Sequence, residues 1–204
     1  MADDWRRRLG NARIITFRQM NKENLYQNFD FSLLDSPDFK EDSVREELIL
    51  PMLKELGYSA QGENKIHRSK SVSHPFVQTG SGKHKLTSIP DYLLEVFGKY
   101  AWVLDAKAPN EDIKTGKNVE QTYFYAIHPE IRVPIYALCN GREFILFHIS
   151  HQKALLYFSL SEIEKHWNEL RQLLAPENFA KNSAPPPAKF VPQIQSLIIF
   201  RANL

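Results

Sequence analysis

The sequence has a single cysteine, Cys139, among its 204 residues. One cysteine cannot form an internal disulfide, so a disulfide framework is excluded. The N-terminal residues lack the apolar stretch of a secretory signal peptide, and we therefore expect a reducing, cytoplasmic location. No apolar run approaches the roughly 20 residues that a membrane-spanning helix needs, so no membrane partner is expected.

The sequence also lacks motifs that would define other classes of protein. A phosphate-binding loop needs a glycine separated by four residues from a Gly-Lys pair, and a hydroxyl residue directly after that pair. Around Gly82 and Lys83 those two positions hold Val77 and His84, so no ATP site is expected in this chain. His148 and His151 have no supporting metal-site pattern, which favours a structural role.

The net charge of +2 is too small to indicate a nucleic-acid partner, but the distribution of charge is informative. Residues 65–85 contain five Lys or Arg residues, three His and no acid. This range is rich in Ser and Gly, and we expect a strand followed by a loop. Because Lys and Arg supply most of the sequence-independent affinity for DNA, we predict DNA contacts from Lys65, Arg68, Lys70, Lys83 and Lys85. A solvated insertion is the alternative.

The composition is that of a soluble globular protein, with 43% hydrophobic and 25% charged residues. Such a chain can bury the core of one domain. Strand and helix patterns fill residues 40–175, which we take as that domain. Residues 1–39 are interpreted as an N-terminal extension, and residues 176–204 as a Pro-rich linker with a C-terminal tail.

A hairpin with charged residues on one face is predicted near the middle of the chain. Two β-rich runs, Asp91–Phe97 and Tyr100–Ala106, flank a Gly-Lys turn. Side chains alternate along a strand, so Asp105 and Lys107 share a face. Asp91, at the start of the first run, supplies a second carboxylate.

Two carboxylates and one ammonium group suit metal-assisted cleavage of a phosphodiester. The carboxylates hold a hard divalent cation and leave positions for water and phosphate. A lysine positions or deprotonates the attacking water and offsets charge in the transition state. The alternative is an ordinary hairpin with a solvated Asp-Lys pair.

The number of residues in the hairpin sets a condition on this site. With a two-residue turn at residues 98–99, Asp91 would lie opposite Ala106 and face away from Asp105. The site therefore requires a connection with an odd number of residues, or a β-bulge near Pro90. We expect one of these two irregularities.

One helix is predicted before the hairpin and one after it. Apolar residues recur at helical spacing between residues 44 and 56, and Pro51 should kink or divide this first helix. Glu41 precedes Arg45 by one turn, which by itself indicates only a surface pair. In the second helix, residues 118–128, Gln121 and Tyr125 lie one turn apart on the same face.

Further strands complete the predicted sheet. Residues 134–140 and 142–149 are strand-like and join at Asn140-Gly141, a strong hairpin turn signal. Residues 154–160 favour one more strand, followed by a helix that ends near Leu174. We therefore expect an α/β fold with a central mixed β-sheet flanked by helices.

In their order, these features resemble the N-terminal nuclease domain of type I restriction-enzyme R subunits. Pro90-Asp91 followed by Asp105-Ala106-Lys107 looks like the PD-(D/E)xK motif. Gln121 and Tyr125 match the Q-x-x-x-Y feature behind the lysine strand. The first helix matches through Glu41, Arg45, Pro51-Met52-Leu53 and Leu56-Gly57-Tyr58. The resemblance covers roughly residues 41–147.

The resemblance implies a restriction-endonuclease-like fold and a Mg²⁺-dependent DNA endonuclease, with Mn²⁺ as a substitute for Mg²⁺. The implied metal ligands are Asp91, Asp105 and the Ala106 carbonyl. Lys107 would handle the attacking water, Glu41 would assist at the metal or its water, and Gln121 and Tyr125 would position Lys107 or the DNA. Asp42 or Glu46 would replace Glu41 if the register of the helix differs.

The resemblance also implies partners beyond double-stranded DNA. R subunits couple this domain to an ATP-driven translocating motor and act with methylation and specificity subunits. Since this chain contains no motor, we expect either a fragment of a larger subunit or a free-standing relative. One alternative is a catalytically inactive DNA-binding or assembly module of a restriction complex. The other is an interaction domain that shares the pattern by chance.

Overall fold

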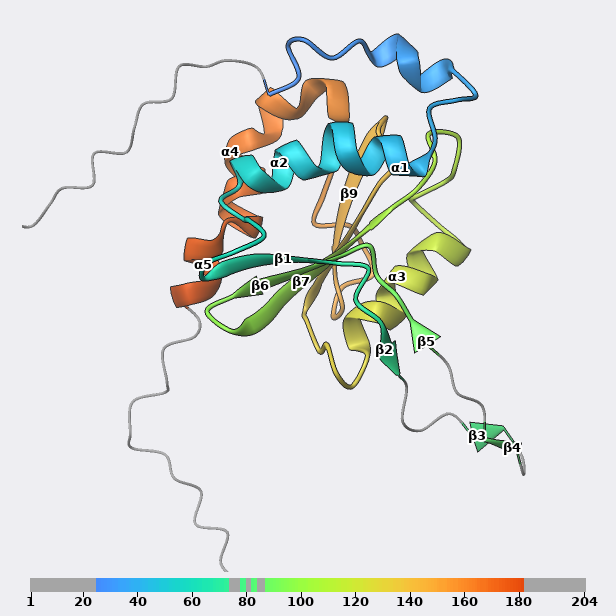
Figure 1. The fold of residues 1–204 in the computed structure, drawn as a ribbon, viewed down its shortest axis with the longest axis vertical. Helices are drawn as coiled ribbons and strands as arrows, with labels where there is room; N and C mark the ends of the chain where they lie inside the picture. Colours follow the sequence, from blue (N-terminus) through green and yellow to red (C-terminus); the bar gives the residue numbers. More distant parts are fainter. Residues whose placement is uncertain (1–24, 74–77, 80–81, 84–86, 182–204) are drawn as a thin grey trace, which may run out of the picture.

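The computed structural model describes residues 25–73, 78–79, 82–83 and 87–181, which form a β-sheet with helices on both faces (Figure 1). The six-stranded sheet has the order β1-β6-β7-β8-β9-β10. β7 and β8 pair in parallel, and the other neighbouring strands pair antiparallel. The arrangement agrees with the restriction-endonuclease-like α/β fold predicted from the sequence. The strands are β1 (Asn64–Arg68), β6 (Tyr92–Val96), β7 (Lys99–Ala106), β8 (Ile135–Cys139), β9 (Glu143–His148) and β10 (Leu156–Ser159).

Two hydrophobic cores lie on opposite faces of the sheet, because side chains alternate along each strand. Trp102 and Leu104 of β7 face one core, which also receives residues from α2, α4 and α5. Val103 faces the second core, which is covered by α3. The helical elements are η1 (Phe31–Asp35), α1 (Glu41–Ser43), η2 (Val44–Ile49), α2 (Leu50–Glu55), α3 (Lys117–Ile127), η3 (Leu160–Glu162), α4 (Ile163–Leu174) and α5 (Pro176–Lys181).

The irregularity predicted at Pro51 takes the form of a π-helical segment. This segment, η2, connects α1 to α2 directly before the proline, which lies in the first turn of α2. Proline has no N–H to donate and disturbs the hydrogen bonds of the preceding turn. Two carbonyls of this segment also accept side-chain hydrogen bonds, since the hydroxyls of Tyr26 and Tyr92 bond the carbonyls of Leu48 and Arg45 at 2.6 and 2.9 Å.

The basic range after β1 contains two short ladders in its described residues. β2 (Val72–Ser73) pairs with β5 (Thr87–Ser88), and β3 (Gln78–Thr79) pairs with β4 (Gly82–Lys83). Figure 1 shows this arm projecting from the sheet near the start of β6. Where the sequence predicted a loop, the described parts form these two short antiparallel ladders.

Residues before position 40 and after position 175 also pack on the first core. Buried Tyr26 and the rings of Phe29 and Phe31 form edge-to-face contacts with one another. These rings pack on the first core, and α5 contributes Phe179 to the same core. Residues 1–24 and 182–204, which include most of the predicted extension and tail, lie outside the described residues.

The β6–β7 hairpin contains an irregularity at a position that we did not predict. Its turn is Phe97-Gly98, where both residues have positive φ angles of 47° and 78°. The register then shifts between Leu94 and Glu95, which leaves Ala101 of β7 as an extra residue. The connection therefore has an even number of residues, and the bulge lies far from Pro90. Neither of the two predicted irregularities is present, and a bulge at Ala101 takes their place.

This bulge determines which residues face one another at the open end of the hairpin. Beyond it, Tyr92 pairs with Leu104. Continuing the same register by one residue places Asp91 opposite Asp105, and opposed residues share a face. Without the bulge, Asp91 would lie opposite Leu104 and point to the other side of the sheet.

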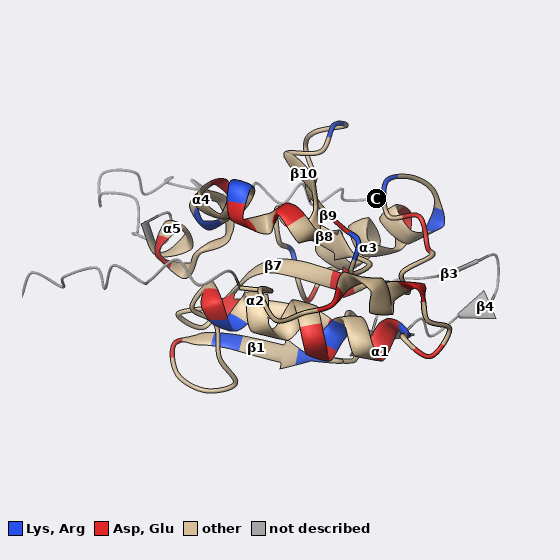
Figure 2. Ribbon diagram, turned by 90° about the horizontal axis from the view of Figure 1, so that it is seen from above, with Lys and Arg blue, Asp and Glu red and all other residues tan. Residues whose placement is uncertain are grey.

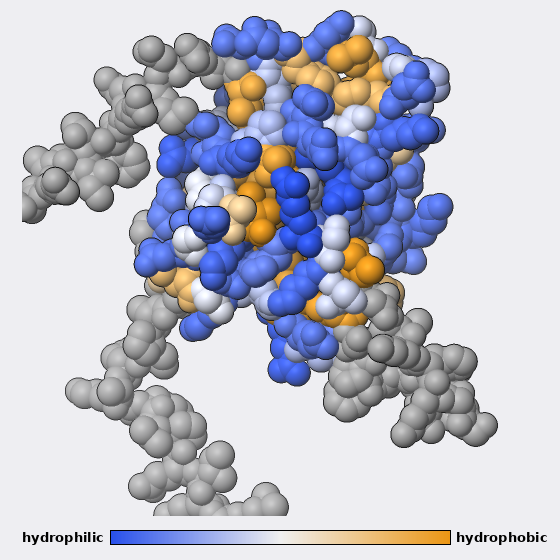
Figure 3. Space-filling model, in the orientation of Figure 1, coloured by the Kyte–Doolittle hydropathy of each residue, from blue (hydrophilic) through white to orange (hydrophobic). Residues whose placement is uncertain are grey.

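The face of the molecule shown in Figure 3 is largely polar. In Figure 3 the apolar side chains on the visible face form separate patches between hydrophilic residues. None of the helices in the described part of the chain has the length and apolarity that crossing a bilayer requires.

Candidate active site

Asp91 and Asp105 meet where β6 begins and β7 ends. Asp91 directly precedes β6, and its Oδ2 accepts a 2.8 Å hydrogen bond from the main-chain N–H of Ala106. The N–H and C=O of one residue in a strand point to the same side. The Ala106 carbonyl therefore faces the side of Asp91, while the Asp105 side chain projects from the sheet toward α3.

Lys107 completes this group of charges. Its Nζ lies 2.6 Å from Oδ2 of Asp105 and 3.5 Å from Oε1 of Gln121. Its main-chain N–H donates to the Cys139 carbonyl at 2.9 Å and so continues the pairing of β7 with β8. Lys107 is held at both its backbone and its side chain, and only 8% of the residue is exposed.

Burial and mutual attraction shift the pKa values of Asp105 and Lys107. It raises the pKa of Asp105 to about 6, and attraction to Lys107 offsets only part of this effect. Burial alone would lower the pKa of Lys107, but the charge of Asp105 and its hydrogen bond raise it above the ordinary value. Lys107 is therefore a firmly protonated ammonium in this arrangement.

Helix α3 supplies the residues that surround this pair. Gln121 donates to the hydroxyl of Tyr125 at 2.6 Å, so the two predicted residues form one chain of contacts that leads to Lys107. Thr122, which is fully buried, places its hydroxyl 3.5 Å from Asp105. Sequence reasoning missed Thr122, and its only signal was its position beside Gln121.

Glu41 lies at the first turn of α1 in the electrostatic field of the site. Burial raises the pKa of Glu41, the charge of Asp91 raises it further, and Lys107 opposes both effects. Figure 2 shows acidic residues on α1 and β7. Of the two alternatives to Glu41, Asp42 is largely exposed and pairs with Arg45 at 3.2 Å, and Glu46 is exposed on η2.

Arg45 is a second residue that the sequence did not identify as part of the site. Its Nη1 lies 3.5 Å from Oδ1 of Asp91, and its Nη2 lies 3.2 Å from the Ser69 hydroxyl. In the sequence Arg45 was noted only as the neighbour of Glu41 one turn along a helix and as part of the family's helix pattern, with no role in the site. Its contact with Asp91 depends on how that helix packs on the sheet.

The predicted DNA-binding residues are distributed unevenly around the site. Lys65 in β1 forms a 3.2 Å ion pair with Glu95, and the ammonium of Lys70 bonds the Tyr100 hydroxyl. Arg68 ends β1 and lines a groove beside Arg45 and Tyr92. Lys83 lies in β4, where only the backbone is described, and Lys85 lies outside the described residues.

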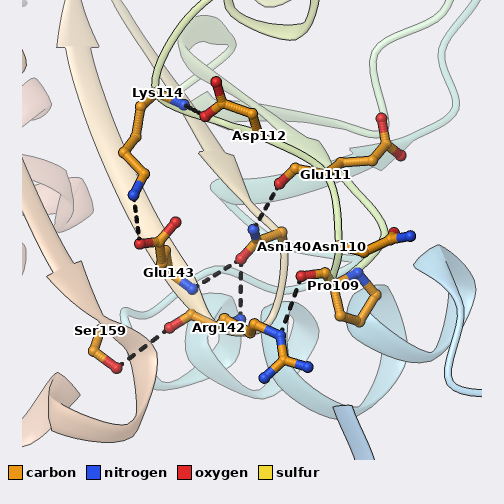
Figure 4. Close-up of a pocket in the computed structure, with 9 residues that line it drawn as sticks. All are labelled: Pro109, Asn110, Glu111, Asp112, Lys114, Asn140, Arg142, Glu143 and Ser159. Carbon is orange, nitrogen blue, oxygen red and sulfur yellow. Dashed lines mark hydrogen bonds and ion pairs between the residues drawn. The ribbon is translucent and has the colours of Figure 1, made fainter. Parts of the chain in front are cut away.

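A polar pocket of about 520 Å³ lies beside the loop that follows Lys107 (Figure 4). The Asn140 amide donates to the Glu111 carbonyl at 2.9 Å, and Arg142 donates to the Pro109 carbonyl at 3.2 Å. Lys114 pairs with Glu143 at 2.8 Å across the same pocket. These contacts hold the loop against β9, and we assign no ligand to the pocket.

The donor set fits a hard divalent cation. Within the described residues, no three His, Cys, Asp or Glu side chains converge as a metal-binding group. The candidate site instead offers two carboxylates, Asp91 and Asp105, and the main-chain carbonyl of Ala106. Oxygen ligands of this kind suit Mg²⁺, which retains several water molecules when proteins bind it.

Comparisons with known proteins give a distant likeness to a solved structure. No protein-family model and no curated protein matches the sequence. Among solved structures, the chain is similar to a fragment described as an HsdR subunit of a type I restriction enzyme from Vibrio vulnificus YJ016, with a TM-score of 0.43 and 23% identity. The match covers 63% of this chain and 25% of that one. A likeness at this level establishes neither family nor activity, so the functional assignment rests on the residues of the site.

Proposed function

We propose that this chain is a Mg²⁺-dependent DNA endonuclease domain of the PD-(D/E)xK type, which hydrolyses phosphodiester bonds. One observation carries the proposal. Asp91 reaches the main-chain N–H of Ala106, so two carboxylates, a main-chain carbonyl and the Lys107 ammonium group meet at one edge of the sheet. Two oxygen ligands beside a lysine are what metal-assisted hydrolysis of a phosphodiester needs.

Each residue of the site has a role in this proposal. Asp91, Asp105 and the Ala106 carbonyl would hold the cation, which supplies Lewis acidity at the scissile phosphate when it is bound. Lys107 orients the attacking water and offsets negative charge in the transition state. Glu41 assists at the water. Gln121 and Tyr125 hold the Lys107 ammonium in position through their chain of contacts.

We further propose a place for the domain in a restriction system. The order of the sequence motifs supports this place. Double-stranded DNA would be the substrate, and a translocating motor and methylation or specificity subunits would be partners in the cytoplasm. Arg68, at the end of β1 next to Arg45, provides positive charge beside the site.

Cleavage of supercoiled plasmid DNA tests the proposal. With Mg²⁺ or Mn²⁺ the wild-type chain should nick or linearise the plasmid, and a chelator should stop it. Asp105→Ala and Lys107→Ala should each lower the rate by about 100-fold or more. Lys165→Ala, which removes an exposed lysine on α4, is the matched control and should cut normally. Cleavage by Asp105→Ala at the wild-type rate would contradict the assignment.

A catalytically inactive DNA-binding or assembly module is the second candidate. It is favoured by the pairing of each aspartate with a cation of the chain itself, Asp105 with Lys107 and Asp91 with Arg45. Such a module would bind DNA with the same affinity with and without Mg²⁺, and Asp105→Ala would not change that affinity. The endonuclease proposal requires the opposite result in both measurements.

A further inference from the structure

Arg45 makes a contact that the proposed function does not use. Its guanidinium lies 3.5 Å from Oδ1 of Asp91, while Lys107 lies 2.6 Å from Oδ2 of Asp105. Each of the two carboxylates proposed as metal ligands is thus paired with one cation of the chain. Lys107 already has a role in the reaction, and the question is what Arg45 does when its carboxylate binds a metal.

The two oxygens of Asp91 have different partners. Oδ2 accepts the hydrogen bond from the Ala106 N–H, which fixes the side chain, and Oδ1 faces Arg45. A cation that binds Asp91 through Oδ1 therefore competes with the guanidinium for one oxygen. Two positive charges close to that oxygen repel each other, so binding of the cation weakens the Arg45–Asp91 pair.

The remaining contacts of Arg45 allow it to move. Its Nη1 also lies 3.2 Å from Asp42, but the Asp42 side chain is 88% exposed, and such ion pairs contribute little. Its Nη2 bonds the Ser69 hydroxyl at 3.2 Å. The hydroxyl of Tyr92 holds the Arg45 backbone through its carbonyl at 2.9 Å. The backbone is therefore fixed, while the guanidinium has neutral or exposed partners apart from Asp91.

We propose that Arg45 is a phosphate-binding residue that leaves Asp91 when this carboxylate binds the cation and then contacts the DNA backbone beside the scissile bond. This inference rests on the proposed function. The planar guanidinium offers five N–H donors in a fork that matches two phosphate oxygens. Arg45 thereby couples binding of the cation to binding of DNA.

The charges around Arg45 determine on which side the phosphate lies. Arg45 also borders a groove of about 750 Å³, whose lining includes the two basic residues Arg45 and Arg68. The acidic residues of the lining outnumber these two arginines, so the groove as a whole repels phosphate: Asp30, Asp42, Glu46 and Glu47. The phosphate therefore binds on the Asp91 side of Arg45, where the cation neutralises the two carboxylates.

Calorimetric titration with Mn²⁺ alone tests the first half of the inference. Arg45→Gln removes the competing charge, so the variant should bind Mn²⁺ about three- to tenfold more tightly than the wild type. Arg171→Gln is the matched control, because Arg171 forms an exposed pair with Glu177 on α4 and α5. Its Mn²⁺ affinity should equal that of the wild type.

Binding of a short fluorescent DNA duplex tests the second half. All proteins carry Lys107→Ala so that the duplex is not cut, and affinity is measured with Mn²⁺ and with a chelator. Mn²⁺ should raise the DNA affinity of the protein that carries Lys107→Ala alone. Adding Arg45→Gln should make this Mn²⁺-dependent increase in DNA affinity smaller by about fivefold or more. Arg45→Lys keeps the charge but not the fork, so its Mn²⁺ affinity should stay near that of the wild type while the gain in DNA affinity is partly lost.

The outcomes separate this inference from the proposed function. If the wild type binds Mn²⁺ and Arg45→Gln binds it equally or more weakly, Arg45 merely supports Asp91 and the inference is wrong. An unreduced gain in DNA affinity in both Arg45 variants would also overturn it. If Arg45→Gln does not fold, the two readouts of Arg45→Lys decide the matter. A wild type that binds no Mn²⁺ would remove the proposed function and this inference together.

Discussion

The Asp91 carboxylate accepts a 2.8 Å hydrogen bond from the main-chain N–H of Ala106, 15 residues away in the sequence. β6 begins only at Tyr92, so no strand backbone lies opposite Ala106 at this edge. The Asp91 side chain takes the place of that missing partner. This one hydrogen bond gives the Ala106 N–H, at the end of β7, an acceptor. It also brings a second carboxylate close to Asp105.

Variants of Asp91 should separate its structural and metal-binding roles. Asp91→Asn keeps an oxygen acceptor for Ala106 and should retain wild-type stability while it loses Mn²⁺ binding. Asp91→Ala leaves the N–H of Ala106 without its acceptor and should lower the free energy of unfolding by about 1–2 kcal/mol. Urea denaturation and Mn²⁺ titration measure the two effects. Retained Mn²⁺ affinity in Asp91→Asn would show that this carboxylate is not a ligand.

The tight turn of the β6–β7 hairpin should be sensitive to residue type. Gly98 has a φ angle of 78°, and an added Cβ there would meet no atom within 4 Å. Gly98→Ala should therefore cost about 1 kcal/mol through backbone strain alone. The exposed residue Phe97 also has a positive φ angle, of 47°, which Asn tolerates better.

Phe97→Asn is thus the complementary variant, and it should not lower the free energy of unfolding. Thermal denaturation of both variants checks this expectation. Equal stability of Gly98→Ala and the wild type would mean that the turn does not hold the conformation described.

Glu95 should stabilise the fold in a pH-dependent way. It is buried on β6, where burial alone would raise its pKa, but contacts with His67 at 2.9 Å and Lys65 at 3.2 Å lower it below the ordinary 4.5. A carboxyl group with a lowered folded-state pKa stabilises the fold above its ordinary pKa. That contribution disappears as the pH falls through the folded-state value.

Glu95→Gln should therefore cost about 1 kcal/mol near neutral pH and much less at low pH, below the folded-state pKa of Glu95. Urea denaturation at both pH values measures the difference. Glu169→Gln on α4 removes an exposed carboxylate and serves as the control. A loss of stability in Glu95→Gln that is the same at both pH values would contradict the ion-pair explanation.

The basic residues of the range 65–85 should contribute to DNA binding without regard to base sequence. Phosphate binding by lysine releases counterions, so replacing Lys83 and Lys85 by Ala should weaken binding similarly for different duplexes. The slope of log affinity against log salt should fall by about 0.9 for each phosphate that the variant no longer neutralises. Fluorescence anisotropy over a range of salt concentrations gives this slope. An unchanged slope would leave the arm as an insertion without a role in DNA binding.

Local rules predicted much of the site from the sequence. Alternation along β7 placed Asp105 and Lys107 together, and their 2.6 Å contact agrees with it. Counting residues in the hairpin showed that a regular two-residue turn could not bring Asp91 to the same face. The count could not locate the bulge at Ala101, because Phe97 adopts a backbone conformation that its residue type disfavours.

Contacts between distant elements could not be predicted in this way. Arg45 reaches Asp91, and Thr122 reaches Asp105, only because η2 and α3 pack at particular positions on the sheet. No spacing rule within a helix specifies those positions. Tyr26 illustrates the same limit, since its sequence neighbourhood gave no sign that it packs into the first core.

Titration of the protein with Mn²⁺ tests the central claim, a divalent cation bound by Asp91 and Asp105, most directly. The wild type should bind the cation, and Lys107→Ala should bind it at least as tightly, because the competing ammonium is removed from Asp105. Asp105→Ala should lose the binding. Equal Mn²⁺ affinity in the wild type and Asp105→Ala would contradict the assignment of this site.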